Sequence, residues 1–98
     1  MSTVVRETKE TQITVTVTRG TGLATVDTTR EFLDHMLVTF AKYSGLDVTV
    51  HARGDLPHHL IEDVAICVGA AVAAALPPTA ARYADRTIPM DDALVQCA

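Results

Sequence analysis

Several features that mark particular classes of protein are scarce in this sequence of 98 residues. Basic residues are outnumbered, since eight Lys and Arg stand against twelve Asp and Glu and leave a net charge of −4. This balance argues against a nucleic acid or an anionic membrane as partner, because both attract basic surfaces. Aromatic residues make up only 4%, yet apolar residues reach 48%, which is typical of a folded globular chain and excludes a disordered one.

Long apolar runs and paired cysteines are also missing. The best candidate for a membrane span, Val64–Leu76, has 13 residues and is rich in alanine, which favours a buried helix. The first ten residues lack the apolar stretch of a secretory signal. Cys67 and Cys97 do not have the spacing of a metal knuckle and are expected to be small buried groups. We therefore expect one cytoplasmic domain over residues 1–98, with no membrane partner.

Strict alternation of apolar and polar residues predicts half-buried strands at 11–18 and 46–53. Residues 23–28 are predicted to pair with the first of these strands, so that 11–28 forms one β-hairpin. The charged run at 6–11 is expected, taken alone, to be a solvated arm. The residues predicted to point inward are Ile13, Val15, Val17, Leu46, Val48 and Val50.

Two helices are predicted between and after these strands. Thr28 to Glu31 fits a capping box, and the helix that follows is expected to end at Gly45. A second helix is expected to begin near Pro57 or His58 and to run to Leu76. The apolar face of the first helix is predicted to comprise Phe32, Leu33, Met36, Leu37 and Phe40.

The second predicted helix is apolar all round, so we expect it to be central and buried. It carries more apolar surface than one small sheet can cover, and its far side is expected to pack against another copy or another domain. The order β-β-α-β-α, followed by an extended piece within 84–97, predicts an α+β fold of two layers, with the helices on one face of a sheet.

Three of the four histidines lie beside carboxylates, which makes them candidates for metal binding. His58 and Glu62 are four residues apart on the second helix, so they share a face and can hold one ion. His59 is about 100° further round and is expected to point away from that ion, which favours a two-metal cluster. The helix N-terminus is expected to keep both imidazoles neutral. The alternative is that the histidines cap the helix or lie in solvent.

Other polar residues are candidates only in combination. Glu10 becomes interesting if it reaches the metal site, where a carboxylate can move protons. Arg82 and Arg86 can bind a phosphate or carboxylate through two parallel hydrogen bonds, but taken alone they are expected to be surface residues. His35 is likewise expected to be a surface histidine, and His51 to be solvated on the polar face of its strand. Imidazoles and carboxylates without a thiolate suit manganese, zinc, iron or nickel.

Taken together, these pieces resemble the imidazoleglycerol-phosphate dehydratase family of histidine biosynthesis. The matching stretches, in the family's order, are RETKET at 6–11, FLDHML at 32–37, GLDVTVHARGDL at 45–56, HHLIEDVAICVG at 58–69 and RYADRTIPMDDAL at 82–94. The resemblance implies a half-domain of the ribosomal protein S5 domain 2-like fold, which packs through its helices against a second half. It also implies cage-like homo-oligomers with active sites between subunits.

The resemblance further implies a chemistry and residue roles. Family members bind two Mn²⁺ ions, which act as Lewis acids on the imidazole of the phosphate substrate and allow loss of water to give imidazole acetol phosphate. Asp55 and Asp63 match positions that support the site. The matching metal ligands are His35, His58, His59 and Glu62; Glu10 matches the carboxylate of proton transfer, and Arg82 a substrate-contacting arginine.

Some residues depart from the family pattern. Pro57 stands alone where an acidic stretch is common, Thr39 replaces a Gln, and Tyr43 replaces a His. Asp91 and Asp92 occupy the place of a phosphate-binding loop that contains Lys. The matching segments cover one half of the family's architecture. We therefore expect either a dehydratase completed by self-association, or a non-catalytic half that needs a partner chain. A metal-binding protein of another pathway on the same fold is a third reading.

Overall fold

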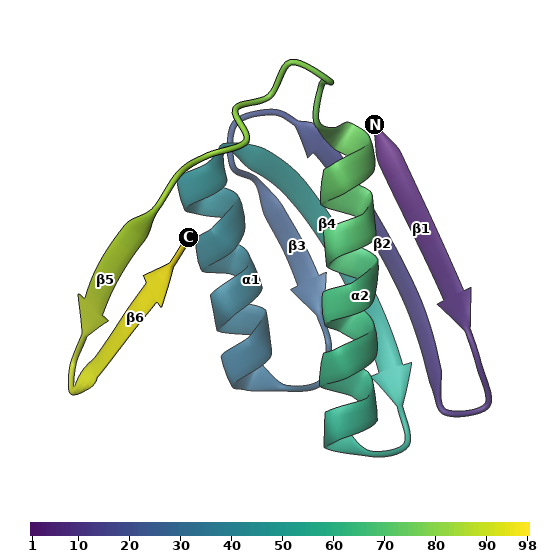
Figure 1. Cartoon of the computed structure of the whole chain (residues 1–98). Coiled ribbons are helices and arrows are strands. Elements are labelled where there is room, and N and C mark those ends of the chain that lie inside the picture. The colour runs from purple at the N-terminus through teal and green to yellow at the C-terminus, as the bar shows by residue number, and fades with distance from the viewer.

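The computed structural model describes residues 1–98 and contains six strands and two helices (Figure 1). In chain order these are β1 (Ser2–Glu7), β2 (Thr11–Arg19), β3 (Ala24–Asp27), α1 (Glu31–Ser44), β4 (Leu46–Gly54), α2 (Pro57–Ala75), β5 (Arg86–Met90) and β6 (Ala93–Cys97). The expected mixed α+β fold is confirmed, and both helices lie on the same face of the larger sheet.

The main sheet has the strand order β1-β2-β4-β3. Strand β2 pairs antiparallel with both β1 and β4, whereas β3 runs parallel to β4. The predicted hairpin over 11–28 is therefore wrong, because β4 lies between β2 and β3. The charged run at 6–11 is also not a solvated arm, because Arg6 and Glu7 belong to edge strand β1 and Thr11 opens β2. The Ser2 hydroxyl of β1 donates to the carbonyl of Ala71 on α2 at 2.8 Å.

The core lies between the inner face of this sheet and one side of each helix. All six residues predicted to point inward from β2 and β4 are buried. The outward residues of these strands are polar and more exposed, including His51, as expected for a sheet with one solvated face. The helical part of the core consists of Leu37, Ala41, Leu60, Val64, Cys67 and Ala71.

The start of α1 differs from the predicted capping box. The N-cap residue is Arg30, and no side chain caps the helix. Instead, the Thr28 amide and hydroxyl both donate to Asp34 Oδ1, at 2.8 and 2.6 Å. This arrangement depends on Thr29, which turns the chain with a φ of 67°. The predicted end is confirmed, since Gly45 closes the helix with a φ of 74°.

Helix α2 begins at Pro57 as predicted, but it is not buried all round. Its buried residues follow one stripe facing the sheet, while Ile61 and Ile66 on other sides are exposed. By length and composition α2 is apolar enough to cross a membrane, a test that core helices of soluble proteins also pass. Much of its apolar surface therefore remains free on this chain.

The predicted extended piece near the C-terminus is a separate hairpin. Strands β5 and β6 pair only with each other, and every residue in both is exposed. Figure 1 shows this hairpin projecting beside α1, away from the main sheet. A lone two-stranded hairpin is marginally stable in water, so this element gains little from the rest of the chain.

Candidate active site

The turn between β1 and β2 approaches the start of α2 closely enough to build a site. Gly54, the last residue of β4, makes this approach possible. A Cβ added there would come within 3.1 Å of the Thr11 methyl carbon, and within 3.3 Å of both the Glu10 carbonyl oxygen and the Leu60 Cβ. These contacts are tighter than ordinary packing. The sequence GDL at 54–56 therefore allows Glu10 to lie beside the first turn of α2.

Asp55 joins these two segments through both its backbone and its side chain. Its amide donates to the Glu10 carbonyl at 2.9 Å. Its Oδ1 atom accepts a hydrogen bond from His59 Nδ1 at 2.8 Å. The carboxylate therefore fixes the orientation of the His59 ring, and its backbone fixes the turn that carries Glu10.

Glu10 is the second carboxylate beside His59, with Oε2 3.6 Å from Nδ1. The hydrogen bond to Asp55, followed by the charge of Glu10, raises the pKa of His59 above its ordinary value. The same hydrogen bond lowers the pKa of Asp55. These two carboxylates therefore act on the His59 imidazole in the opposite sense to the helix N-terminus, which disfavours the protonated ring.

His58 and Glu62 are both exposed on α2, as their shared helical face predicts. The rings of His58 and His59 remain neighbours, with centroids 4.2 Å apart and planes tilted by 59°, rather than diverging. No group of three or more His, Cys, Asp or Glu side chains converges in a geometry ready to hold a metal. The chain gathers donors of the expected kind without completing a coordination sphere.

The remaining candidate residues lie elsewhere. His35 is exposed on α1, and no hydrogen bond or ion pair joins its side chain to the α2 histidines. Arg82 lies in the loop after α2, among residues at the C-terminal end of that helix. The 19 residues of α2 span about 28 Å at 1.5 Å per residue, so Arg82 and His58 lie near opposite ends of this helix. Arg86 is exposed at the start of β5.

Two residues of this region were missed in the sequence analysis. Thr11 is fully buried, and its hydroxyl donates to Asp63 Oδ2 at 2.7 Å. Arg6 approaches the same oxygen, with Nε at 3.4 Å. The hydrogen bond from Thr11, followed by the Arg6 charge, lowers the pKa of Asp63. Thr11 has the same parity in β2 as Ile13, so the alternation itself contained the signal that it points inward.

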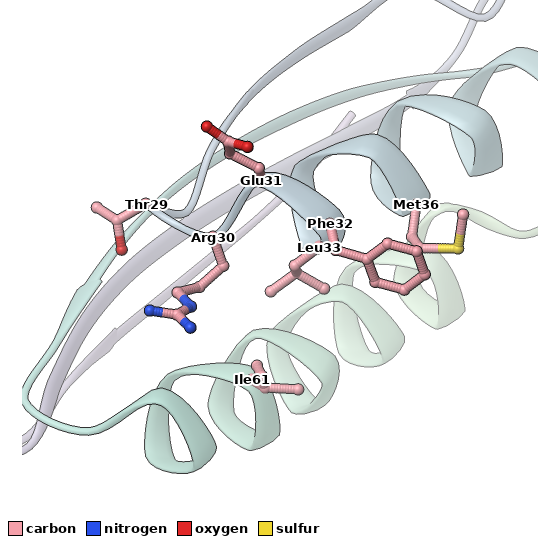
Figure 2. Close-up of a pocket in the computed structure, with 7 residues that line it drawn as sticks. All are labelled: Thr29, Arg30, Glu31, Phe32, Leu33, Met36 and Ile61. Carbon is pink, nitrogen blue, oxygen red and sulfur yellow. The ribbon is translucent and has the colours of Figure 1, made fainter.

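The cavity between the helices does not coincide with these residues. A hollow of about 650 Å³ lies between the first turns of α1 and the facing side of α2 (Figure 2). Figure 2 shows Leu33 of α1 facing α2, which contributes Ile61, with Arg30 on one side of Leu33 and Phe32 and Met36 on the other. None of the predicted site residues lines it, so the hollow is part of the apolar helix face rather than of the candidate site.

Comparisons with known proteins identify the family of this chain. The family profile described as imidazoleglycerol-phosphate dehydratase matches residues 28–98. A dehydratase of this name from Chlorobium phaeovibrioides is 43% identical over 99% of this chain and 52% of its own length. One from Lactococcus lactis subsp. cremoris is 48% identical over 98% of this chain and 53% of its own length. The chain spans about half the length of the curated relatives it matches.

Solved structures show the same correspondence in space. The crystal structure of the dehydratase from Pyrococcus furiosus superposes with a TM-score of 0.78 at 42% identity, covering 95% of this chain and 51% of that one. The Staphylococcus aureus enzyme gives a TM-score of 0.77 at 29% identity, with 97% and 54% covered. Sequence profile, relatives and backbone agree that this chain belongs to the imidazoleglycerol-phosphate dehydratase family.

Proposed function

We propose that this chain takes part in the dehydration of imidazoleglycerol phosphate to imidazole acetol phosphate, as a cytoplasmic enzyme of histidine biosynthesis. Family membership supports this reaction. The observation that carries it in the structure is the approach of Glu10 to His59, with 3.6 Å between Oε2 and Nδ1. These residues come from segments 49 positions apart in the sequence, 59 − 10, and both match the family's motifs.

The kinds of donor fit Mn²⁺ as cofactor. His59 donates its Nδ1 proton to Asp55, which leaves Nε2 free, and metal-binding histidines commonly have such a carboxylate behind them. We propose His35, His58, His59 and Glu62 as the ligands of a two-metal cluster. When bound, the metal supplies Lewis-acid stabilisation of the imidazole ring and a template for the substrate.

Glu10 is placed to move a proton. Its side chain is 54% exposed, so it can reach a substrate above the first turn of α2, while its backbone is held by Asp55. In the proposed reaction the carboxylate accepts the proton that leaves the carbon chain, and the hydroxyl on the neighbouring carbon takes up one proton and leaves as water. The resulting enol tautomerises to the ketone, so atoms balance as substrate minus water.

The separation of Arg82 and His35 from the α2 histidines supports a site assembled from more than one copy. Between α1 and α2 runs an apolar groove of about 530 Å³, in which nine of ten lining residues are hydrophobic. We propose that a second copy of the chain covers this groove, so that Arg82 of one copy can bind the substrate phosphate near the histidines of another.

The experiment is turnover of imidazoleglycerol phosphate by the purified chain loaded with Mn²⁺, with imidazole acetol phosphate as the measured product. We expect Glu10→Gln to lower kcat by about 10²-fold or more and to leave the mass of the assembly unchanged. Turnover that appears only when a second, different chain is added would favour the alternative of a split dehydratase. No turnover under either condition would remove the proposal.

A further inference from the structure

Asp63 on α2 contacts both strands of the hairpin formed by β1 and β2. Its Oδ2 atom accepts the Thr11 hydroxyl at 2.7 Å and lies 3.4 Å from Arg6 Nε. Thr11 opens β2, Arg6 lies in β1, and Asp63 is 9% exposed, one helical turn after His59. One carboxylate oxygen of Asp63 therefore contacts both strands of the hairpin and links them to α2.

The turn above this anchor has little freedom of its own. The Thr8 hydroxyl accepts the amides of Glu10 and Thr11, at 3.1 and 3.0 Å. The Glu10 carbonyl in turn accepts the Asp55 amide at 2.9 Å. Residues 8–11 of the turn are thus held together as one unit. Their position relative to α2 depends on the contacts that the unit makes with α2.

Two neighbouring contacts link the turn to α2. Glu10 and Thr11 are neighbours in the chain, and His59 and Asp63, four residues apart on a helix, are neighbours on one face. Glu10 faces His59 and Thr11 binds Asp63. The Asp55 amide and the pairing of Thr11 with Gly54 hold the backbone of the turn to β4, and the Thr11–Asp63 hydrogen bond adds the contact that holds it to α2.

We propose that Thr11 and Asp63 are positioning residues, whose hydrogen bond holds the β1–β2 turn on α2 and so sets the Glu10 carboxylate against His59. The inference rests on the proposed function, in which Glu10 and His59 face the substrate. Its consequence is catalytic because a shift of about 1 Å in a reacting group can cost 10²-fold in rate. A purely structural bond would stabilise the fold without determining where Glu10 lies.

The test compares Thr11→Val, which keeps the shape and removes the hydroxyl, with Thr11→Ser, which keeps the hydroxyl. In isotope-labelled protein without metal, nuclear Overhauser contacts between the Glu10 side chain and the His59 ring report their distance. We expect Thr11→Val to abolish these contacts and to speed exchange of the Asp55 amide by roughly ten- to a hundredfold. Thr11→Ser is expected to keep both signals as in the unsubstituted chain.

Thr28→Val is the matched control. Thr28 is also fully buried, and its hydroxyl donates to a helical carboxylate, Asp34 Oδ1, at 2.6 Å, but at the start of α1. We expect it to lower the melting temperature about as much as Thr11→Val and to leave the Glu10–His59 contacts intact. If Thr11→Val also leaves these contacts intact, the positioning role is wrong. If Thr11→Val does not fold, Arg6→Gln at a half-exposed side chain weakens the same anchor and is expected to speed Asp55 exchange by a smaller factor.

Activity separates this inference from the proposed function. In chain that turns over imidazoleglycerol phosphate, we expect Thr11→Val to lower kcat by about 10²-fold with little change in KM, and Thr11→Ser to restore it. If the unsubstituted chain shows no turnover, the proposed function is contradicted. The nuclear Overhauser contacts between Glu10 and His59 still decide whether Thr11 has a positioning role. Normal kcat in Thr11→Val contradicts the positioning role and leaves the function standing.

Discussion

Thr29 carries a β-branched side chain at a φ of 67°, in the left-handed region that disfavours such residues. Glycine adopts this region without a steric cost, although its unfolded chain is more flexible. We expect Thr29→Gly to stabilise the fold by about 0.5–1 kcal/mol and to raise the melting temperature by a few degrees, measured by calorimetry. Thr29→Ala keeps the Cβ and is expected to gain little. A lower melting temperature for Thr29→Gly than for Thr29→Ala would contradict the argument.

Asp47 holds the loop before β3. Its Oδ1 atom accepts the amides of Leu23, Thr21 and Gly22 at 2.9, 3.0 and 3.1 Å. These bonds, Leu23 first, lower the pKa of Asp47 below its ordinary value of 3.8. A lowered folded pKa stabilises the fold above the unfolded pKa, and this stabilisation is lost as the pH falls through the folded pKa.

The charge of Asp47 therefore contributes to acid sensitivity. We expect Asp47→Asn to make the free energy of unfolding fall less steeply between about pH 5 and pH 2, measured by urea unfolding across that range. Asp92→Asn, in the exposed β5–β6 turn, serves as the control and should keep the steep profile. Equal slopes for Asp47→Asn and the unsubstituted chain would show that the loop amides do not depend on the charge.

Helix α2 has two apolar faces with different roles in one chain. Val64 is 1% exposed and belongs to the core beneath the groove, whereas Ile61 is 44% exposed at the groove surface. We expect Val64→Ala to lower the free energy of unfolding by about 1–3 kcal/mol, and Ile61→Ala to lower it by about 0.5 kcal/mol or less. Urea unfolding at a concentration where the chain is monomeric measures both. Similar losses at the two positions would mean that the groove is already filled within one chain.

The strands and helices were predictable to the extent that local pattern determines them. Alternation located β2 and β4, and Gly45 located the end of α1. The pairing of β3 was not predictable, because residues 23–28 follow β2 directly and nothing local shows that β4 inserts between them. Parallel pairing with β4 depends instead on the helix between β3 and β4, which crosses over the sheet.

The same limit applies to the candidate site. The motif HHxxE placed His58, His59 and Glu62 on the first turns of one helix, as the structure has them. The approach of Glu10 was left conditional, since it depends on a Gly54 backbone close to another strand. Thr11 was missed even though its parity placed it inside, because a threonine that opens a strand was grouped with the charged run. The positions of Glu10 and Thr11 depend on contacts across the sheet, which the spacing of residues in the sequence does not show.

At the scale of the whole molecule, covering the groove and completing the metal site are expected to be one event. Ala65 and Ala70 are both exposed on α2, but only Ala65 lines the groove. Because a buried unpaired carboxylate is strongly disfavoured, we expect Ala65→Glu to reduce the species seen by native mass spectrometry to 10.5 kDa and to abolish manganese retention. Ala70→Glu, the same change outside the groove, is expected to preserve both. Assembly and metal retention by Ala65→Glu equal to those of Ala70→Glu would place the contact between copies on a different surface.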